Sequence, residues 1–206
     1  MARNAEKDLQ QREQRMNDIL DAAIEVMAVK GVGSASMQHI AGAAGISIGN
    51  LYHYFKSKEE IFAEVLRRGQ TGYGEFVRSV ADGPGEARAK LLTIAENWLA
   101  LGNSWAHTIL IHTARLSEAS EELRRDVTGR FTVNLQPVAA IIAQGQAEGT
   151  APEGDPLELA FYFTSLIQGL TLQRMPGSEV PVPMRAASVV DLFAGRREAL
   201  DRRRDA

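Results

Sequence analysis

The residues that most suggest covalent chemistry form a Gly-x-Ser-x-Gly pattern, Gly45-Ile46-Ser47-Ile48-Gly49. In hydrolases this pattern holds a nucleophilic serine on a sharp turn between a strand and a helix, with a histidine and an acid later in the chain. Here the residues before Ser47, from Gln38 to Ala44, are alanine-rich and favour a helix, so the required strand is not predicted. We therefore expect no catalytic role for Ser47 and no enzyme activity.

A metal site is also not expected from the histidines. His107 and His112 are five residues apart on a predicted helix, whereas zinc-binding pairs on one helix face usually have a spacing of four. The chain has no cysteine, which excludes disulfides and thiolate ligands. We expect no cofactor, and we expect the two histidines to line an internal pocket or to face solvent.

The segment around Ser47 also has the composition of a surface that reads DNA. Two predicted short helices, Ser36 to Ala44 and Ser47 to Tyr54, are joined by a tight turn at Gly45, which is the layout of a helix-turn-helix. Serine is a favoured N-cap, so each helix begins with a suitable residue. The helical period turns Leu51 and Phe55 toward the first helix and leaves a polar, open face. The residues on or near that face are Ile48, Gly49, Asn50, His53 and Tyr54.

Such a face suits the major groove. Asn50 can pair bidentately with adenine, and Gly49 permits close approach of the helix backbone to the bases. The segment from Val26 to Lys58 contains no Asp or Glu, so it is locally cationic although the whole chain has a net charge of −3. An ordinary helical hairpin that lacks acids by chance remains the alternative interpretation.

The rest of the chain is read as helices separated by breakers. A polar extension, residues 1–14, precedes an amphipathic helix that begins near Met16 and is capped by Gly31. Ser57 and Glu60 match a capping box and begin a fourth helix, which Gly83-Pro84-Gly85 ends. The further helices are expected near 91–101, 109–116, 123–148 with a kink at Pro137, 157–174 and 184–204.

Two classes of protein are excluded by composition. No apolar run approaches the ~18 to 20 residues that span a bilayer, so a transmembrane protein is not expected. The polar first residues lack the apolar stretch of a signal peptide. We therefore expect a cytoplasmic protein with no membrane partner.

The amino-acid sequence of the amino-terminal quarter resembles the DNA-binding domain of the TetR (tetracycline-repressor) family. The resemblance is carried by Ser36-Met37-Gln38-His39-Ile40-Ala41, by Ala44-Gly45-Ile46-Ser47, and above all by the run from Ser47 to Glu59, Ser-Ile-Gly-Asn-Leu-Tyr-His-Tyr-Phe-Lys-Ser-Lys-Glu. Many positions agree at fixed spacing, which makes the match specific. Val32 departs from it, because the family often has an aromatic residue after the glycine.

The resemblance implies roles for individual residues. Those implied to reach base edges are Gln38, Ile48, Gly49, Asn50 and Tyr52. Those implied to contact phosphates, which orient the protein without reading sequence, are Ser36, Ser47, Tyr52, Tyr54 and Lys58. Packing within the domain is the alternative role for Tyr52.

The carboxyl-terminal body is expected to bind a small molecule and to dimerise. The residues expected to line a mostly apolar pocket are Tyr73, Phe76, Trp98, Trp105, His107, His112 and Phe131. Core packing is the alternative role for the tryptophans. A helix that is apolar on two sides must be covered on two sides. We therefore expect a symmetric four-helix dimer interface from the last two helices, formed by Phe163, Leu166, Ile167, Leu170, Val189, Val190 and Phe193.

Together these observations predict an all-α protein with an N-terminal three-helix helix-turn-helix DNA-binding domain, residues 15–60, and a larger helical effector-binding and dimerisation domain, residues 61–206. The leading hypothesis is a homodimeric repressor that a small, mostly apolar effector releases from a palindromic operator in double-stranded DNA. Two alternatives stay open, a helical DNA-binding protein without an effector and a helical enzyme or carrier that uses the pocket.

Overall fold

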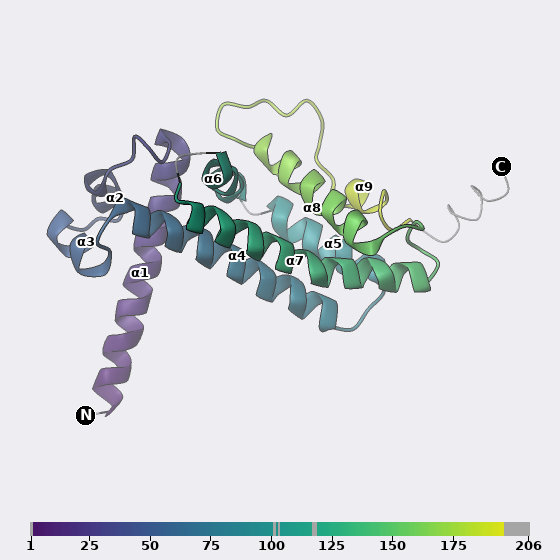
Figure 1. The fold of residues 1–206 in the computed structure, drawn as a ribbon, viewed down its shortest axis with the longest axis horizontal. Coiled ribbons are helices and arrows are strands. Elements are labelled where there is room, and N and C mark those ends of the chain that lie inside the picture. The colour runs from purple at the N-terminus through teal and green to yellow at the C-terminus, as the bar shows by residue number, and fades with distance from the viewer. Residues whose placement is uncertain (1, 101, 103, 117–118, 196–206) are drawn as a thin grey trace.

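A computed structural model describes residues 2–100, 102, 104–116 and 119–195. Within these ranges the chain is helical and contains no strand, in agreement with the predicted fold class (Figure 1). The helices are α1 (Ala2–Lys30), α2 (Met37–Ala43), α3 (Ile48–Tyr54), α4 (Lys58–Asp82), α5 (Ala87–Ala100), α6 (Ser104–Leu116), α7 (Glu121–Ala147), α8 (Pro156–Leu172) and α9 (Ala186–Val190).

The first three helices and the start of α4 form a small head at one end of the molecule (Figure 1). Its core is formed by apolar side chains that include Ile19, Ile40 and Leu51, each completely buried. The turn between α2 and α3 requires Gly45, whose φ is +65°, and Ile46 N donates to Ala41 O at 3.0 Å to close it. This pattern is a Schellman motif, in which glycine takes the left-handed position without steric cost.

The predicted helix starts of the head are confirmed. The hydroxyls of Ser36, Ser47 and Ser57 each accept a hydrogen bond from a backbone N–H three residues later. The capping box differs in one detail, because Glu60 Oε2 accepts from Lys56 N at 2.6 Å, one residue before the N-cap. The third helix ends at Tyr54, the last residue of the predicted Ser47 to Tyr54 helix.

The remaining helices pack into a longer body, in which α4 and α7 lie side by side and α5 and α8 cover them (Figure 1). The contact between α4 and α7 is close at Gly74, where a Cβ atom would lie 2.2 Å from Asn134 Oδ1. A larger residue at position 74 would therefore displace the Asn134 side chain, which is bonded to Gln70 O. None of the described helices is long and apolar enough to cross a bilayer.

Several predicted boundaries need correction. The first helix begins at Ala2, so the polar residues 2–14 continue α1 instead of preceding it. The helix predicted to start at Ile109 starts at Ser104. The helix predicted over 184–204 ends at Val190, where Phe193 N bonds to Val190 O at 2.9 Å and the chain turns. Residues 196–204 of that prediction lie outside the described residues.

The predicted dimer interface also needs correction. Five of its seven side chains belong to the core of the single chain, namely Phe163, Ile167, Val189, Val190 and Phe193. The other two, Leu166 and Leu170, are half-buried against the same core. The reason is the turn after α9, which brings the Phe193 ring to 5.4 Å from the Phe163 ring and covers that side of α8 with the chain itself.

Candidate DNA-binding head and ligand cavity

The exposed side of the head is formed by α3 and the start of α2. Ile48 and Tyr52 are 45% and 52% exposed although they are large and apolar or aromatic, so their side chains are free to touch a partner. The other exposed positions predicted to face DNA are Gln38, Gly49, Asn50 and His53. Leu51 and Phe55 are buried, and they fix the orientation of α3.

The two serines predicted to contact phosphates have a structural use. Ser36 Oγ accepts from His39 N at 3.2 Å, and Ser47 Oγ accepts from Asn50 N at 3.1 Å. These bonds satisfy backbone donors that the first turn of a helix leaves free. The hydroxyl hydrogen of each serine can still be donated outward.

Lys58 differs from its predicted role. Its ammonium donates to three backbone carbonyls of the loop between α1 and α2, those of Val32, Gly33 and Ala35, at 3.2, 2.8 and 3.1 Å. An ammonium has three N–H donors, so all of them are used within the chain. Lys58 therefore holds the α1–α2 loop against the start of α4. Lys56, which is exposed, is a cation that the sequence argument did not select as a phosphate contact.

Tyr54 is half-buried rather than open. The Arg12 guanidinium lies over its ring, 5.6 Å from the ring centre. This is the geometry of a cation–π contact. It ties the amino-terminal part of α1, which was predicted as a separate extension, to the end of α3.

The body contains a cavity of about 320 Å³, lined by residues of α4, α5, α6, α7 and α8. Five of the seven predicted pocket residues line it, Tyr73, Phe76, Trp98, His107 and Phe131. The other two are not among its lining residues. Trp105, on α6, packs against the core of the head, and His112 lies on α6 beyond the cavity wall.

The polar lining of the cavity was missed by the sequence argument. It includes Gln70, Asn97, Ser104, Asn134, Thr164 and Gln168. Thr164 and Gln168 are four residues apart on the largely apolar helix α8, and this spacing was a usable signal. The other four stand on helices of mixed composition, where their types gave no indication of a shared cavity.

One polar wall of the cavity is locked by hydrogen bonds between α4 and α7. Gln70 Nε2 donates to Val127 O at 2.9 Å, and Arg130 Nε donates to Gln70 Oε1 at 3.0 Å. Asn134 Nδ2 donates to Gln70 O at 2.7 Å. A buried polar group that is fully paired fixes the geometry around it, so this wall is rigid with respect to α7.

The described residues that line the cavity include no Asp, Glu, Lys or Arg. Burial raises the pKa of the Tyr73 hydroxyl, and the nearby Thr164 hydroxyl opposes that rise. Burial also lowers the pKa of His112, helped by the charge of Arg115. No metal-binding group of His, Asp or Glu is found among the described residues.

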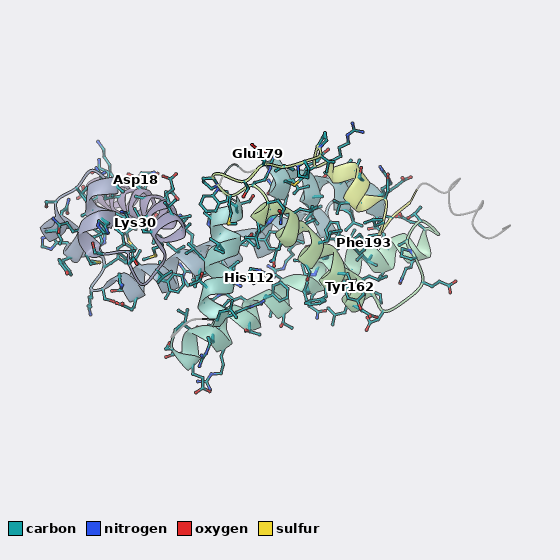
Figure 2. All side chains as sticks on the ribbon, turned by 90° about the horizontal axis from the view of Figure 1, so that it is seen from above. Asp18, Lys30, His112, Tyr162, Glu179 and Phe193 are labelled. Carbon is teal, nitrogen blue, oxygen red and sulfur yellow. The ribbon has the colours of Figure 1, made fainter. Side chains whose placement is uncertain are left out.

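Helix α6 belongs to both the cavity and the head. Leu110 and Ile111 line the cavity, and both are part of the buried core that contains Ile19 and Leu51 of the head. Along the long axis of the molecule, His112 on the same helix lies between Asp18 and Lys30 of the head and Tyr162 and Phe193 of the body (Figure 2). Helix α4 connects the head and the body covalently, and α6 connects them a second time by packing against both.

The head and the whole chain are similar in sequence to known transcriptional regulators. Residues 19–65 match the family model described as "Bacterial regulatory proteins, tetR family". The transcriptional repressor KstR2 of Rhodococcus jostii is 36% identical over 151 residues, which cover 72% of this chain and 74% of that protein. The fatty acid metabolism regulator protein of Bacillus subtilis is 24% identical over 190 residues, 90% of this chain and 96% of that protein.

Solved structures share the whole fold. The MbdR regulator of Azoarcus sp. CIB has a TM-score of 0.73 at 23% identity, covering 88% of this chain and 98% of that one. The FadR regulator of Bacillus subtilis, solved in complex with stearoyl-CoA, has a TM-score of 0.66 at 24% identity, covering 87% and 98%. A regulator of Saccharomonospora viridis, solved in complex with choline, has a TM-score of 0.68 at 23% identity, covering 92% and 95%.

Proposed function

The chain belongs to the TetR family and is a DNA-binding transcriptional regulator, and from this premise we propose that it is a repressor released from a palindromic operator by a small, mostly apolar effector. The observation that carries the proposal is that α6 contributes both to the cavity wall and to the core of the head. Leu110 and Ile111 touch the cavity on one side and the core of the head on the other.

Operator recognition is assigned to the exposed face of α3 and to Gln38. Asn50 and Gln38 have side chains that can pair bidentately with adenine, and both are exposed. Gly49 allows the α3 backbone to lie close to the groove. His53 and Tyr52 are assigned to the edge of the contact. Lys56, which follows the end of α3, is assigned the contact with a DNA phosphate.

Release is assigned to a movement of α4 and α6 relative to each other. The cavity is bounded on one side by α4 and on another by α6, and both helices pack against α1 of the head. An effector that separates these two walls would tilt the head. Two heads must reach successive major grooves about 34 to 36 Å apart, so a small tilt in each is enough to lower affinity. The effector can act only through its different affinities for the two states.

A two-fold operator calls for two copies of the chain, and the surface assigned to that contact is the exposed side of α8. Phe161 and Tyr162 are 46% and 49% exposed, and their rings lie 6.1 Å apart. Phe161 also meets Phe131 of α7 at 6.2 Å, so the patch borders α7. Leu157, 37% exposed, extends the patch by one turn. This surface replaces the one predicted from the sequence.

The experiment is a selection of binding sites from random double-stranded DNA, followed by footprinting. An inverted repeat with half-sites one helical turn apart, protected by two copies of the chain, is the expected result. Operator affinity is then measured with candidate effectors present. Equal binding to all sequences would favour a DNA-binding protein that recognises no operator. A defined operator whose affinity no cavity ligand changes would favour regulation without an effector.

A further inference from the structure

Three buried polar atoms that border the cavity have no hydrogen-bond partner among the described residues. They are Trp98 Nε1 on α5, Ser104 Oγ on α6 and Thr164 Oγ1 on α8. Ser104 and Thr164 are 3% and 6% exposed. The Tyr73 and Thr164 side chains are close enough for a hydrogen bond between them to oppose the rise in the Tyr73 pKa, but no partner meets Thr164 Oγ1 with regular hydrogen-bond geometry. Native proteins leave few buried polar atoms unpaired, and each costs stability until a partner arrives.

Thr164 differs from five other threonines in the described helices. Thr93, Thr108, Thr113 and Thr132 each donate to the backbone carbonyl four residues earlier, which is the ordinary arrangement in a helix. Thr171, two turns after Thr164 on α8, donates to Gln168 O at 2.7 Å and lies 3.1 Å from Thr108 Oγ1. The Thr164 hydroxyl alone among these six lacks such a bond and borders the cavity.

The rest of the lining defines what the partner can be. Because the described lining residues include no Asp or Glu, a cationic ligand would enter without a counter-charge, which is strongly unfavourable. An anionic ligand would meet no Lys or Arg in this lining and only the imidazole of His107, so a neutral ligand fits it best. Aromatic rings can attract a cation, but Trp98 Nε1 is a hydrogen-bond donor and cannot pair with one. The Arg115 guanidinium already lies 4.6 Å from the centre of the Phe131 ring. A second cation beside that ring would be repelled.

We infer that the cavity takes an uncharged, mainly apolar molecule carrying a hydrogen-bonding oxygen, of the ketone, ester or alcohol class, which Trp98, Ser104 and Thr164 hold. This inference deepens the proposed function, because it names the chemical class of the effector. The volume of about 320 Å³ lies at the small end of the range for ligand pockets, about 300 to 1,000 Å³. It therefore fits a compact molecule, and the ligands of the FadR and Saccharomonospora structures, a coenzyme A ester and a cation, belong to other classes.

The test uses four probes of one shape, 2-acetylnaphthalene, 2-isopropylnaphthalene, 2-naphthoate and 2-naphthyltrimethylammonium. Their dissociation constants are measured by equilibrium dialysis against the full-length protein without DNA. The ketone is expected to bind about 2- to 10-fold tighter than the hydrocarbon, which is the net effect of one neutral hydrogen bond. The two charged probes are expected to bind at least about 100-fold more weakly than the ketone.

Matched variants on α8 separate ligand binding from folding. Thr164→Val should weaken the ketone by about 2- to 10-fold, leave the hydrocarbon unchanged, and leave the melting temperature of the free protein equal or higher, because an unpaired hydroxyl is removed. Thr171→Val should lower the melting temperature and leave the ketone affinity unchanged, since Thr171 is hydrogen-bonded and is not among the lining residues.

The inference is overturned if a charged probe binds as tightly as the ketone, if the two variants affect the ketone alike, or if no probe binds up to about 1 mM. Operator affinity is measured separately by fluorescence anisotropy. Selective binding of the ketone with no change in operator affinity would uphold the ligand class and reject release by an effector. The two proposals can therefore fail independently.

Discussion

Arg68 on α4 is bonded to Asp21 on α1, with Arg68 Nη2 2.5 Å from Asp21 Oδ1. Arg68 Nη1 also donates to the backbone oxygen of Asn17 at 3.2 Å. The next two residues of α4, Gly69 and Gln70, line the cavity. The tie between body and head is therefore directly adjacent to the cavity wall, where any movement of α4 caused by a ligand would act on it.

We expect Arg68→Met to weaken the coupling between effector and operator while ligand affinity without DNA stays unchanged. The pair is partly exposed, so its effect on the coupling factor should be about 1.5- to 5-fold. The measurement is ligand affinity with and without saturating operator. Arg67→Met is the control, because Arg67 forms its ion pair with Glu64 inside α4 and not with a residue of α1. Equal coupling in wild type and Arg68→Met would contradict the prediction.

Asn50→Ala and Gln38→Ala should reduce the preference for the true operator over random DNA by about 1 to 3 kcal/mol per lost bidentate contact. Both side chains are exposed, so the melting temperature should change little. Affinities for operator and random duplexes, measured at one salt concentration, check this. A uniform loss of affinity for both duplexes would show that these residues contact the backbone instead of the bases.

Lys58→Met should lower the free energy of unfolding by about 1 to 3 kcal/mol, because the charged donor of three carbonyl hydrogen bonds is removed. Urea denaturation measures this change. Lys56→Met is the matched control and should leave stability unchanged. We expect it to weaken binding to all DNA sequences alike and to reduce the salt dependence of binding. If Lys58→Met were as stable as wild type, the carbonyl contacts would contribute nothing to the free energy of unfolding.

Phe161→Asp should give monomers with wild-type helix content and a large loss of operator affinity. The side chain is half exposed in the single chain, so the change opposes association more than folding. Analytical ultracentrifugation and circular dichroism check the two parts. Leu192→Asp is the control, because Leu192 is 66% exposed outside the proposed contact. If Phe161→Asp remained a dimer with unchanged operator affinity, the dimer interface would have to lie elsewhere.

Stability should fall on mild acidification because of His112. Its pKa is lowered by burial and by Arg115, so between about pH 6.5 and the folded pKa the unfolded chain binds more protons. The free energy of unfolding therefore decreases as the pH falls through this window and decreases no further, from this group, below the folded pKa. Denaturation of wild type and His112→Gln from pH 7.5 to 5 tests it. Parallel curves would exclude a contribution from His112.

The local structure of the head could be predicted from the sequence alone. The serine caps at positions 36, 47 and 57 and the turn at Gly45 depend on contacts within about four residues along the chain. The burial of Leu51 and Phe55 follows from the helical period within one short helix. These features depend on neighbours in sequence, and their motif is specific enough to indicate the family.

Only the tertiary structure decided the roles that depend on distant segments. Lys58 was identified as a cation near DNA, but its three carbonyl partners lie 23 to 26 residues earlier in the chain. Both faces of α8 are apolar, and the sequence does not specify which one the returning chain covers. The turn after α9 buries Phe163 and leaves Phe161 exposed, so the chain itself covers the face of α8 that was predicted to meet a second copy. The cavity has the same origin, because Trp98, Ser104 and Thr164 meet only when α5, α6 and α8 pack together. Hydrophobic patterning fixes how much surface a helix must bury, whereas the partner that buries it is chosen by long-range packing.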